Sequence, residues 1–296
     1  MSTSRRGIRI AVVCLAAWQL SACPEQGSMN ELFCTQLFVA PPDSGVGIKA
    51  AAPRETLWPH NAFLPVTITA KFLNGTPFQR QKVMQYAQVW SNISATHTDE
   101  RGVARRKLRI SFLPDSWANH LVDVRILFHE GGSASYVGSE SRRVDANRPT
   151  MFFGWVDEQH AEQEIRQVVI HEWGHALGLV HEHQSPVARI PWDREKVYDY
   201  YRRTQNPPWT RQDVDENVFR LYDASTTNYT AYDANSIMHY AIPSSLTIGG
   251  YSTPWNSELS PTDSSHFKRL YPYQACIINE TENCCFDRQG RRVPCP

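Results

Sequence analysis

Four histidines and two glutamates fall within the thirteen residues from His171 to His183, HEWGHALGLVHEH, whose remaining side chains are mostly apolar. On an α-helix, His171 and His175 lie on one face, with their Cβ atoms about 5–6 Å apart. Two neutral imidazoles at this separation can bind one Zn²⁺ ion. The spacing therefore requires a fold in which a helix presents both histidines to a metal site.

A catalytic zinc ion usually has three protein ligands, so a third must come from elsewhere in the chain. One candidate is His181, six residues after His175. Gly178 lies between them, and glycine can adopt the left-handed conformation that ends a helix and reverses the chain. The other candidate is Glu195, which would need an acidic residue on a second long helix and leaves Gly178 without a role. The sequence favours His181.

Glu172 directly follows the first histidine, so on a helix it is rotated by about 100° from it and can hold a water molecule beside the metal. Zinc lowers the pKa of a bound water toward about 7. A carboxylate at that place can accept the proton and later deliver it to a leaving amine. We therefore expect Glu172 to be the general base and acid of a hydrolase.

Two segments resemble motifs of a known enzyme family. HEWGHALGLVHE resembles the HExxHxxGxxH motif of metzincin zinc peptidases, and Glu182, directly after the third histidine, points to the astacin family. YDANSIMHY, which ends at Tyr240, resembles the astacin Met-turn. Astacins typically carry two disulfides in the catalytic domain, whereas this chain has no cysteine between Cys34 and Cys276. This difference favours a bacterial member of the family.

The resemblance implies a zinc endopeptidase that hydrolyses internal peptide bonds of proteins. Its single catalytic Zn²⁺ ion would be bound by His171, His175 and His181. Met238 would lie beneath the metal as an apolar base. Tyr240 would be a further ligand that can swing away and hydrogen-bond the tetrahedral intermediate, where a mobile donor stabilises the developing oxyanion. We expect His183 and His239 to be structural.

The sequence around the motifs predicts an α/β (α+β) domain. Strand-like runs, the first with the apolar–polar alternation of a half-buried strand, occur at residues 66–72, 107–113, 122–128 and 149–155. Helices are expected from Thr76-Pro77, over residues 158–177, and after Ser260, where capping residues and first-turn prolines start two of them. The segment GGSASYVGS before the last strand is expected to be a turn.

This order of elements resembles the metzincin fold, with a twisted mixed sheet, a packing helix, an active-site helix and a small C-terminal subdomain. The resemblance covers residues 57–273, which we expect to be the catalytic domain. It also implies that residues 149–155 form the edge strand that pairs with an extended substrate, a form of β-augmentation.

Residues 1–22 have a basic start and a short apolar core, which indicates an export signal too short to cross a membrane as a helix. Leu20-Ser21-Ala22-Cys23 resembles a bacterial lipobox, in which Cys23 is lipidated and anchors the mature protein to a membrane. Ordinary cleavage after Ala22, giving a secreted protein, is the alternative. Residues 23–56 are rich in Pro, Gly, Ser and Ala and are expected to be a linker or tether.

Residues 274–296 form a Cys-rich tail containing Cys276, Cys284, Cys285 and Cys295. Disulfides fit an exported protein. A zinc knuckle is the alternative, but it normally has paired CxxC units, which this tail lacks. Disulfides are therefore the favoured interpretation.

The 30 basic and 30 acidic residues balance, which argues against a nucleic-acid partner and leaves protein or peptide substrates. A rival hypothesis is an envelope binding protein that keeps zinc only for stability, and another is a latent precursor that needs processing. Structural zinc takes a fourth protein ligand and needs no base beside it. Glu172 therefore favours the enzyme.

Overall fold

A six-stranded mixed sheet organises the chain, in the order β1-β7-β8-β6-β2-β5. The computed structural model describes residues 34–37, 55–60, 64–98, 104–205, 207–273, 277–279, 284–286 and 292–293. The strands of the sheet are β1 (Cys34–Leu37), β2 (Val66–Phe72), β5 (Leu108–Phe112), β6 (Val124–Phe128), β7 (Ser133–Tyr136) and β8 (Met151–Phe153). All neighbours are parallel except β7 and β8. The predicted mixed sheet is confirmed.

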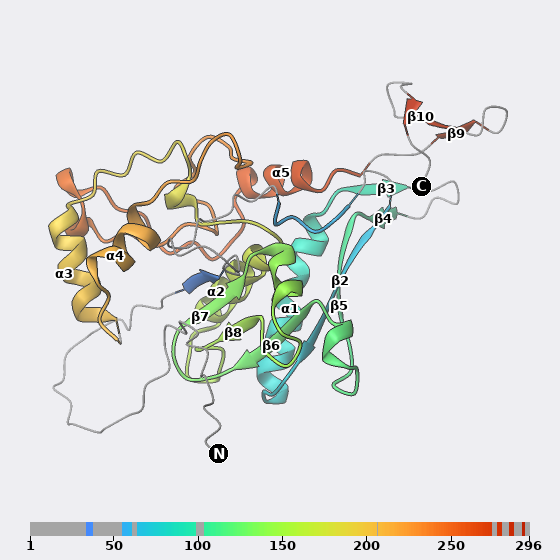
Figure 1. Ribbon diagram of the computed structural model, residues 1–296, viewed down its shortest axis with the longest axis horizontal. Helices are drawn as coiled ribbons and strands as arrows, with labels where there is room; N and C mark the ends of the chain where they lie inside the picture. The colour runs from blue at the N-terminus through green and yellow to red at the C-terminus, as the bar shows by residue number, and fades with distance from the viewer. Residues whose placement is uncertain are drawn as a thin grey trace, which may run out of the picture.

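Two helices pack against each other and against this sheet (Figure 1). Helix α1 (Pro77–Ile93) begins with a capping box, in which Thr76 and Gln79 satisfy each other's backbone N–H groups. Helix α2 (Glu162–Ala176) carries the first two motif histidines. Trp90 of α1 is fully buried and donates its indole N–H to the carbonyl of Ile170 at 2.9 Å. The expected packing helix thus fixes the position of the expected active-site helix.

The C-terminal end of α2 is held by two side chains that are far apart in the sequence, Trp58 and Tyr271. A helix end leaves backbone carbonyls without intrahelical partners. Trp58 donates its indole N–H to the carbonyl of Ala176 at 2.7 Å, and the Tyr271 hydroxyl donates to the carbonyl of Leu177 at 2.8 Å. All of these side chains are buried in one apolar core. The chain therefore closes around the helix that bears the motif.

A second, smaller core lies in the C-terminal half, beside α3 (Arg194–Thr204) and α4 (Arg211–Val214). Its buried members are Val197, Tyr201, Trp209, Val214, Val218 and Leu246. Figure 1 shows α3 and α4 beyond one end of the sheet, on the opposite side of the molecule from β3 and β4. This part is the small C-terminal subdomain that was expected, and α5 (Pro261–Leu270) leads from it back to the main core.

The other elements are short. They are the strands β3 (Thr96–Thr98), β4 (Ala104–Arg106), β9 (Ile277–Asn279), β10 (Cys284–Phe286) and β11 (Arg292–Val293), and the helical turns η1 (Asn119–Leu121), η2 (Gly138–Arg143), η3 (Glu182–Gln184), η4 (Asp215–Phe219), η5 (Ser244–Leu246) and η6 (Ile248–Gly250). Strands β9, β10 and β11 form a separate three-stranded sheet in the Cys-rich tail. None of the helices in the described ranges is long and apolar enough to cross a membrane.

Three expectations about the sheet were wrong. The segment GGSASYVGS is not a turn throughout, because Ser133–Tyr136 forms β7. Residues 149–155 do not form an edge strand, since β8 lies between β6 and β7. Within the expected tether, Cys34–Leu37 forms β1 and pairs in parallel with the outer edge of β7. Glycine and serine are typical of turns, yet Ser133 and Ser135 are buried, and the hydroxyl of Ser133 accepts the N–H of Gly154 at 3.1 Å.

Candidate active site

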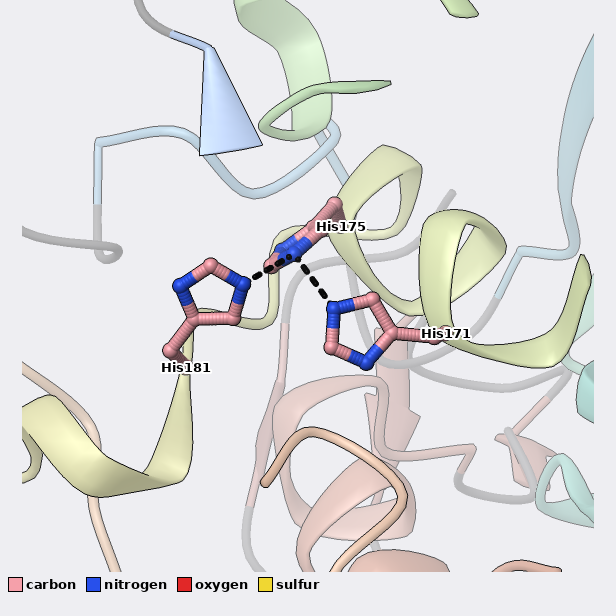
Figure 2. A group of neighbouring side chains, drawn as sticks. All are labelled: His171, His175 and His181. Carbon is pink, nitrogen blue, oxygen red and sulfur yellow. Dashed lines mark hydrogen bonds between the residues drawn. The ribbon is translucent and has the colours of Figure 1, made fainter. Parts of the chain in front are cut away.

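Three histidine rings from the opening motif meet at the end of α2 (Figure 2). His171 and His175 lie one turn apart on the helix, and both are buried. The Nε2 atom of His175 lies 3.1 Å from Nε2 of His171 and 3.0 Å from Nε2 of His181. The structure therefore brings together the three histidines that the spacing selected.

Gly178 reverses the chain between the second and third histidines, as predicted. Its φ angle is +95°, in the left-handed region that favours glycine. Its N–H bonds to the carbonyl of His175 at 2.8 Å, and the N–H of Leu179 bonds to the carbonyl of Gly174 at 3.0 Å. A Cβ atom at Gly178 would lie 2.7 Å from a methyl carbon of Leu57. Both conformation and space therefore restrict this position to glycine.

Hydrogen bonds on the far side of the rings orient two of the histidines. Nδ1 of His171 lies 2.8 Å from the carbonyl of Ile237, and Nδ1 of His175 lies 2.9 Å from the carbonyl of Leu179. A carbonyl can only accept, so each Nδ1 carries the proton and each Nε2 presents a lone pair to the centre. Burial lowers the pKa of His171 to about 4 and that of His175 well below its usual value, so both rings are neutral.

Neutral rings with converging lone pairs repel one another unless a cation lies between them. The three Nε2 atoms are buried together, and imidazole nitrogens fixed by backbone carbonyls are the donor set that zinc prefers. The residues present therefore fit a Zn²⁺ ion.

Glu172 is fully buried beside these rings. No N–H or O–H group among the described residues donates a hydrogen bond to its carboxylate, and its polar neighbour is the thiol of Cys34. Burial raises the pKa of Glu172 well above its usual value. A thiol is a weak donor, so this buried carboxyl group is costly to keep, which indicates that it faces a small polar molecule during function.

The predicted Met-turn lies under the histidines. A Cβ atom on Gly174 would lie 2.3 Å from Sδ of Met238, so the methionine packs directly on the helix between the two ligand candidates. The carbonyl of Met238 accepts the N–H of Glu182 at 2.9 Å. Asp263 holds the turn from below, because its carboxylate accepts from Oγ of Ser236 at 2.6 Å and from the N–H of Ile237 at 2.9 Å.

Tyr240 lies against the histidine cluster. Its ring centroid is 4.2 Å from that of His181 and 4.5 Å from that of His183. Its hydroxyl donates a hydrogen bond to the carbonyl oxygen of Cys34. The phenol is thus already paired with a peptide carbonyl of another chain segment in the cleft.

The two other histidines and the alternative ligand lie outside the metal-binding set. His183 is buried behind His181, and its Nε2 bonds to the carbonyl of Asn217 at 3.1 Å. His239 bonds through Nε2 to the Tyr232 hydroxyl at 2.5 Å. Glu195 lies exposed on α3 and forms an ion pair with Arg211. It is far too solvated to be the third ligand, so that alternative was wrong.

No signal in the sequence indicated that Cys34 belongs to the site. Its buried sulfur, a carboxylate oxygen of Glu172 and a ring nitrogen of His171 all lie within 4.8 Å of one another. Burial also raises the pKa of the Cys34 thiol well above its usual value. Strand β1 thus places a thiol at the histidine cluster, which only the pairing of distant segments could reveal.

Comparisons with known proteins agree with this geometry. The family model for the astacin peptidases matches residues 109–253. Zinc metalloproteinase nas-39 of Caenorhabditis elegans is 24% identical over 261 residues, which cover 81% of this chain and 24% of the relative. Zinc metalloproteinase nas-2 of the same organism is 27% identical over 190 residues, covering 62% of this chain and 52% of the relative. The chain thus spans at most about half the length of these curated relatives.

A solved structure of myroilysin superposes with a TM-score of 0.66. It is 41% identical in sequence, and the match covers 76% of this chain and 99% of myroilysin. A second structure of myroilysin matches with a TM-score of 0.56 and 36% identity, over 82% of this chain and 92% of that one. The fold and the buried histidine cluster define a zinc peptidase of the metzincin class. Within that class, the chain belongs to the astacin family.

Proposed function

We propose that this chain is an exported zinc endopeptidase that hydrolyses internal peptide bonds and is held latent by strand β1. The observation that carries the proposal is the convergence of three neutral imidazoles beside a buried carboxyl group to which no N–H or O–H group among the described residues donates. Unfolded or extended proteins are the expected substrates, because they can add a strand to a sheet edge.

Each side chain of the site has a task in this proposal. His171, His175 and His181 would hold the metal. A Zn²⁺ ion bound there would acidify a water molecule and polarise the scissile carbonyl. Glu172 lies buried beside His171, where its carboxylate can accept the proton of the attacking water and deliver it to the leaving amine.

Tyr240 stabilises the oxygen of the reacting carbonyl. Its hydroxyl already donates to a peptide carbonyl, that of Cys34, and burial raises the pKa of the phenol so that it stays protonated. A donor kept ready in a buried site stabilises negative charge as it develops on oxygen. Met238 supports the cluster from below through its contact with α2.

Latency follows from the position of β1. Its pairing with β7 occupies the sheet edge that an extended substrate needs. A thiolate is a strong ligand for zinc, and Cys34 lies beside His171 and Glu172, where catalysis needs an open position. Removal or displacement of β1 would therefore activate the enzyme.

The test uses the full chain, purified with zinc, and an unfolded protein as substrate. We expect little cleavage before limited proteolysis and cleavage after it, in the parent chain and in a Cys34→Ala variant alike, because the variant loses the thiol but keeps β1 on the sheet edge. Glu172→Gln in the Cys34→Ala background should reduce the rate by at least about a hundredfold. Glu195→Gln is the matched control, because that exposed carboxylate pairs with Arg211 on the surface, away from the histidine cluster.

Equal cleavage with and without Glu172 would sink the proposed mechanism. A folded Cys34→Ala chain that binds zinc and still cleaves nothing after limited proteolysis would instead support a zinc-stabilised binding protein. A chelator should abolish cleavage, and added zinc should restore it.

Export and the domain limits are part of the same proposal. The signal at residues 1–22, the lipidation of Cys23 and most of the linker at residues 23–56 lie outside the described residues. So do Cys276, Cys295 and the side chains of Cys284 and Cys285, on which tail disulfides depend. Residues 57–273 are proposed as the catalytic domain. The mass of the mature N-terminal peptide decides between a lipid anchor and secretion, since an unmodified Cys23 excludes the anchor.

A further inference from the structure

Gln36 of β1 forms hydrogen bonds with three polar partners beside the histidine cluster. Its Nε2 donates to Oε1 of Gln184 at 2.6 Å and also to the hydroxyl of Tyr222. Its Oε1 accepts the backbone N–H of His181 at 3.3 Å. We call the pocket formed by Gln184, the Tyr222 hydroxyl and the N–H of His181 the amide pocket.

The amide pocket is held by hydrogen bonds that do not involve Gln36. Gln184 is 3% exposed, and its own Nε2 donates to the carbonyl of Glu216 at 3.0 Å. That carbonyl can only accept, so Oε1 of Gln184 must face the pocket. The N–H of Tyr222 bonds to the backbone carbonyl of Gln184 at 2.9 Å, which couples the two walls. The pocket therefore offers a set pattern of an acceptor, a hydroxyl and an N–H donor.

Only a primary carboxamide matches this pattern with one planar group. It supplies two N–H donors to the acceptors and one carbonyl oxygen to the donor. A carboxylate has no hydrogen to donate to Gln184. An apolar side chain would leave all three buried groups without hydrogen bonds, and the desolvation cost of these groups would strongly weaken its binding.

The amide pocket also lies where a substrate would run. Gln36 is two residues from Cys34, so both side chains project from the same side of β1, Cys34 toward the histidine cluster and Gln36 toward the amide pocket. A substrate strand that replaces β1 along β7 presents alternate side chains to the same two places.

We propose that the amide pocket is a specificity subsite that selects glutamine or asparagine in the substrate, about two positions from the residue at the histidine cluster. This inference rests on the proposed peptidase function and names its substrate class. In the latent chain, Gln36 fills the subsite as a substrate side chain would.

The first test measures cleavage preference. The Cys34→Ala chain, activated by limited proteolysis, is incubated with a library of peptides from denatured protein, and the cleaved bonds are mapped. We expect glutamine and asparagine to be enriched at one position near the scissile bond. For matched peptides with Gln or Met at that position, the ratio of kcat/KM should fall about tenfold in a Tyr222→Phe variant, the effect of one hydrogen bond. Tyr229→Phe, at an exposed tyrosine, is the control and should leave the ratio unchanged.

A second readout does not need hydrolysis. In the full zinc-bound chain, Gln36→Met should speed alkylation of Cys34 by iodoacetamide at least about tenfold, because β1 loses its polar anchor. The subsite is overturned if the alkylation rate is unchanged. It is also overturned if the enzyme shows no preference for glutamine or asparagine, or if the ratio of kcat/KM is the same in Tyr222→Phe as in its parent. Faster alkylation in a chain that cleaves nothing supports the amide pocket while the proposed function fails, so the two failures are distinguishable.

Discussion

Replacing Gly178 with alanine tests whether this residue directs the third histidine to the site. Two costs are expected. The φ angle of +95° is in the left-handed region, which costs a residue with a Cβ about 1–2 kcal/mol. The new Cβ would also lie 2.7 Å from a terminal methyl carbon of Leu57, a partly exposed side chain that can rotate away, so this contact adds about 1 kcal/mol, the low end for overpacking. Together they lower the free energy of unfolding by about 2–3 kcal/mol.

Gly249 provides a matched control within the same chain. Its φ angle is +75°, but a Cβ there would meet nothing within 4 Å. Gly249→Ala should therefore show only the conformational cost of about 1–2 kcal/mol. The difference between the two variants isolates the contact with Leu57.

The assay is urea unfolding of both variants and the parent chain, together with zinc affinity measured by competition with a chromogenic chelator. Gly178→Ala should be the less stable variant and should bind zinc at least about tenfold more weakly, because the displaced turn moves His181. Gly249→Ala should keep the parent affinity. Equal zinc affinity in Gly178→Ala and Gly249→Ala would refute the argument that Gly178 positions His181.

Three further substitutions test the supports of the site. Gly174→Ala places a Cβ 2.3 Å from Sδ of Met238 and should lower the free energy of unfolding, measured in urea, by about 1–3 kcal/mol. An unchanged free energy would show that the Met-turn can move away from the helix without cost. Asp263→Ala removes the acceptor that fixes Ser236 and the turn and should cost about 3 kcal/mol by the same measurement, with the exposed Asp223→Ala as a near-neutral comparison. His266 has its pKa lowered to about 4 by burial, so the unfolded chain takes up a proton there between about pH 6.5 and 4 while the folded chain does not. Stability should therefore decline as pH falls through that window, and by about 2 kcal/mol less in His266→Gln; identical pH profiles would contradict this assignment.

The sequence predicted the parts of the site that depend on local geometry. A spacing of four residues on a helix brings His171 and His175 together, and a glycine at position 178 allows the chain to reverse. These relations involve neighbours along the chain, so the pattern contains them in full. The strands that alternate or run apolar, such as Val66–Phe72, were found for the same reason.

The sequence could not predict the parts that depend on pairing between distant segments. Strand β7 has the composition of a turn, and its place in the sheet follows from which strands fit beside β8 and α2. In the sequence, Cys34 is one of several cysteines of a chain with an export signal, and nothing there relates it to Glu172. Only the position of β1 in the folded protein places its thiol beside that carboxylate. No pattern in the sequence marks Gln36 as a site residue, because its hydrogen-bond partners lie far along the chain and come together only in the folded protein.

The hydrogen bond from Trp58 to the end of α2 limits how much of the chain could be removed together with β1. The carbonyl of Thr56 accepts the N–H of Ser139 at 2.7 Å, and Leu57 packs on Gly178, so the chain from Thr56 onward supports the catalytic helix. On the proposed latency, a protease that cuts between Leu37 and Thr56 would separate β1 from the catalytic helix and leave these supports in place. A cut after Trp58 would remove β1 together with the supports of the helix. We therefore predict that activating cleavage, or the start of an active recombinant chain, falls between Leu37 and Thr56.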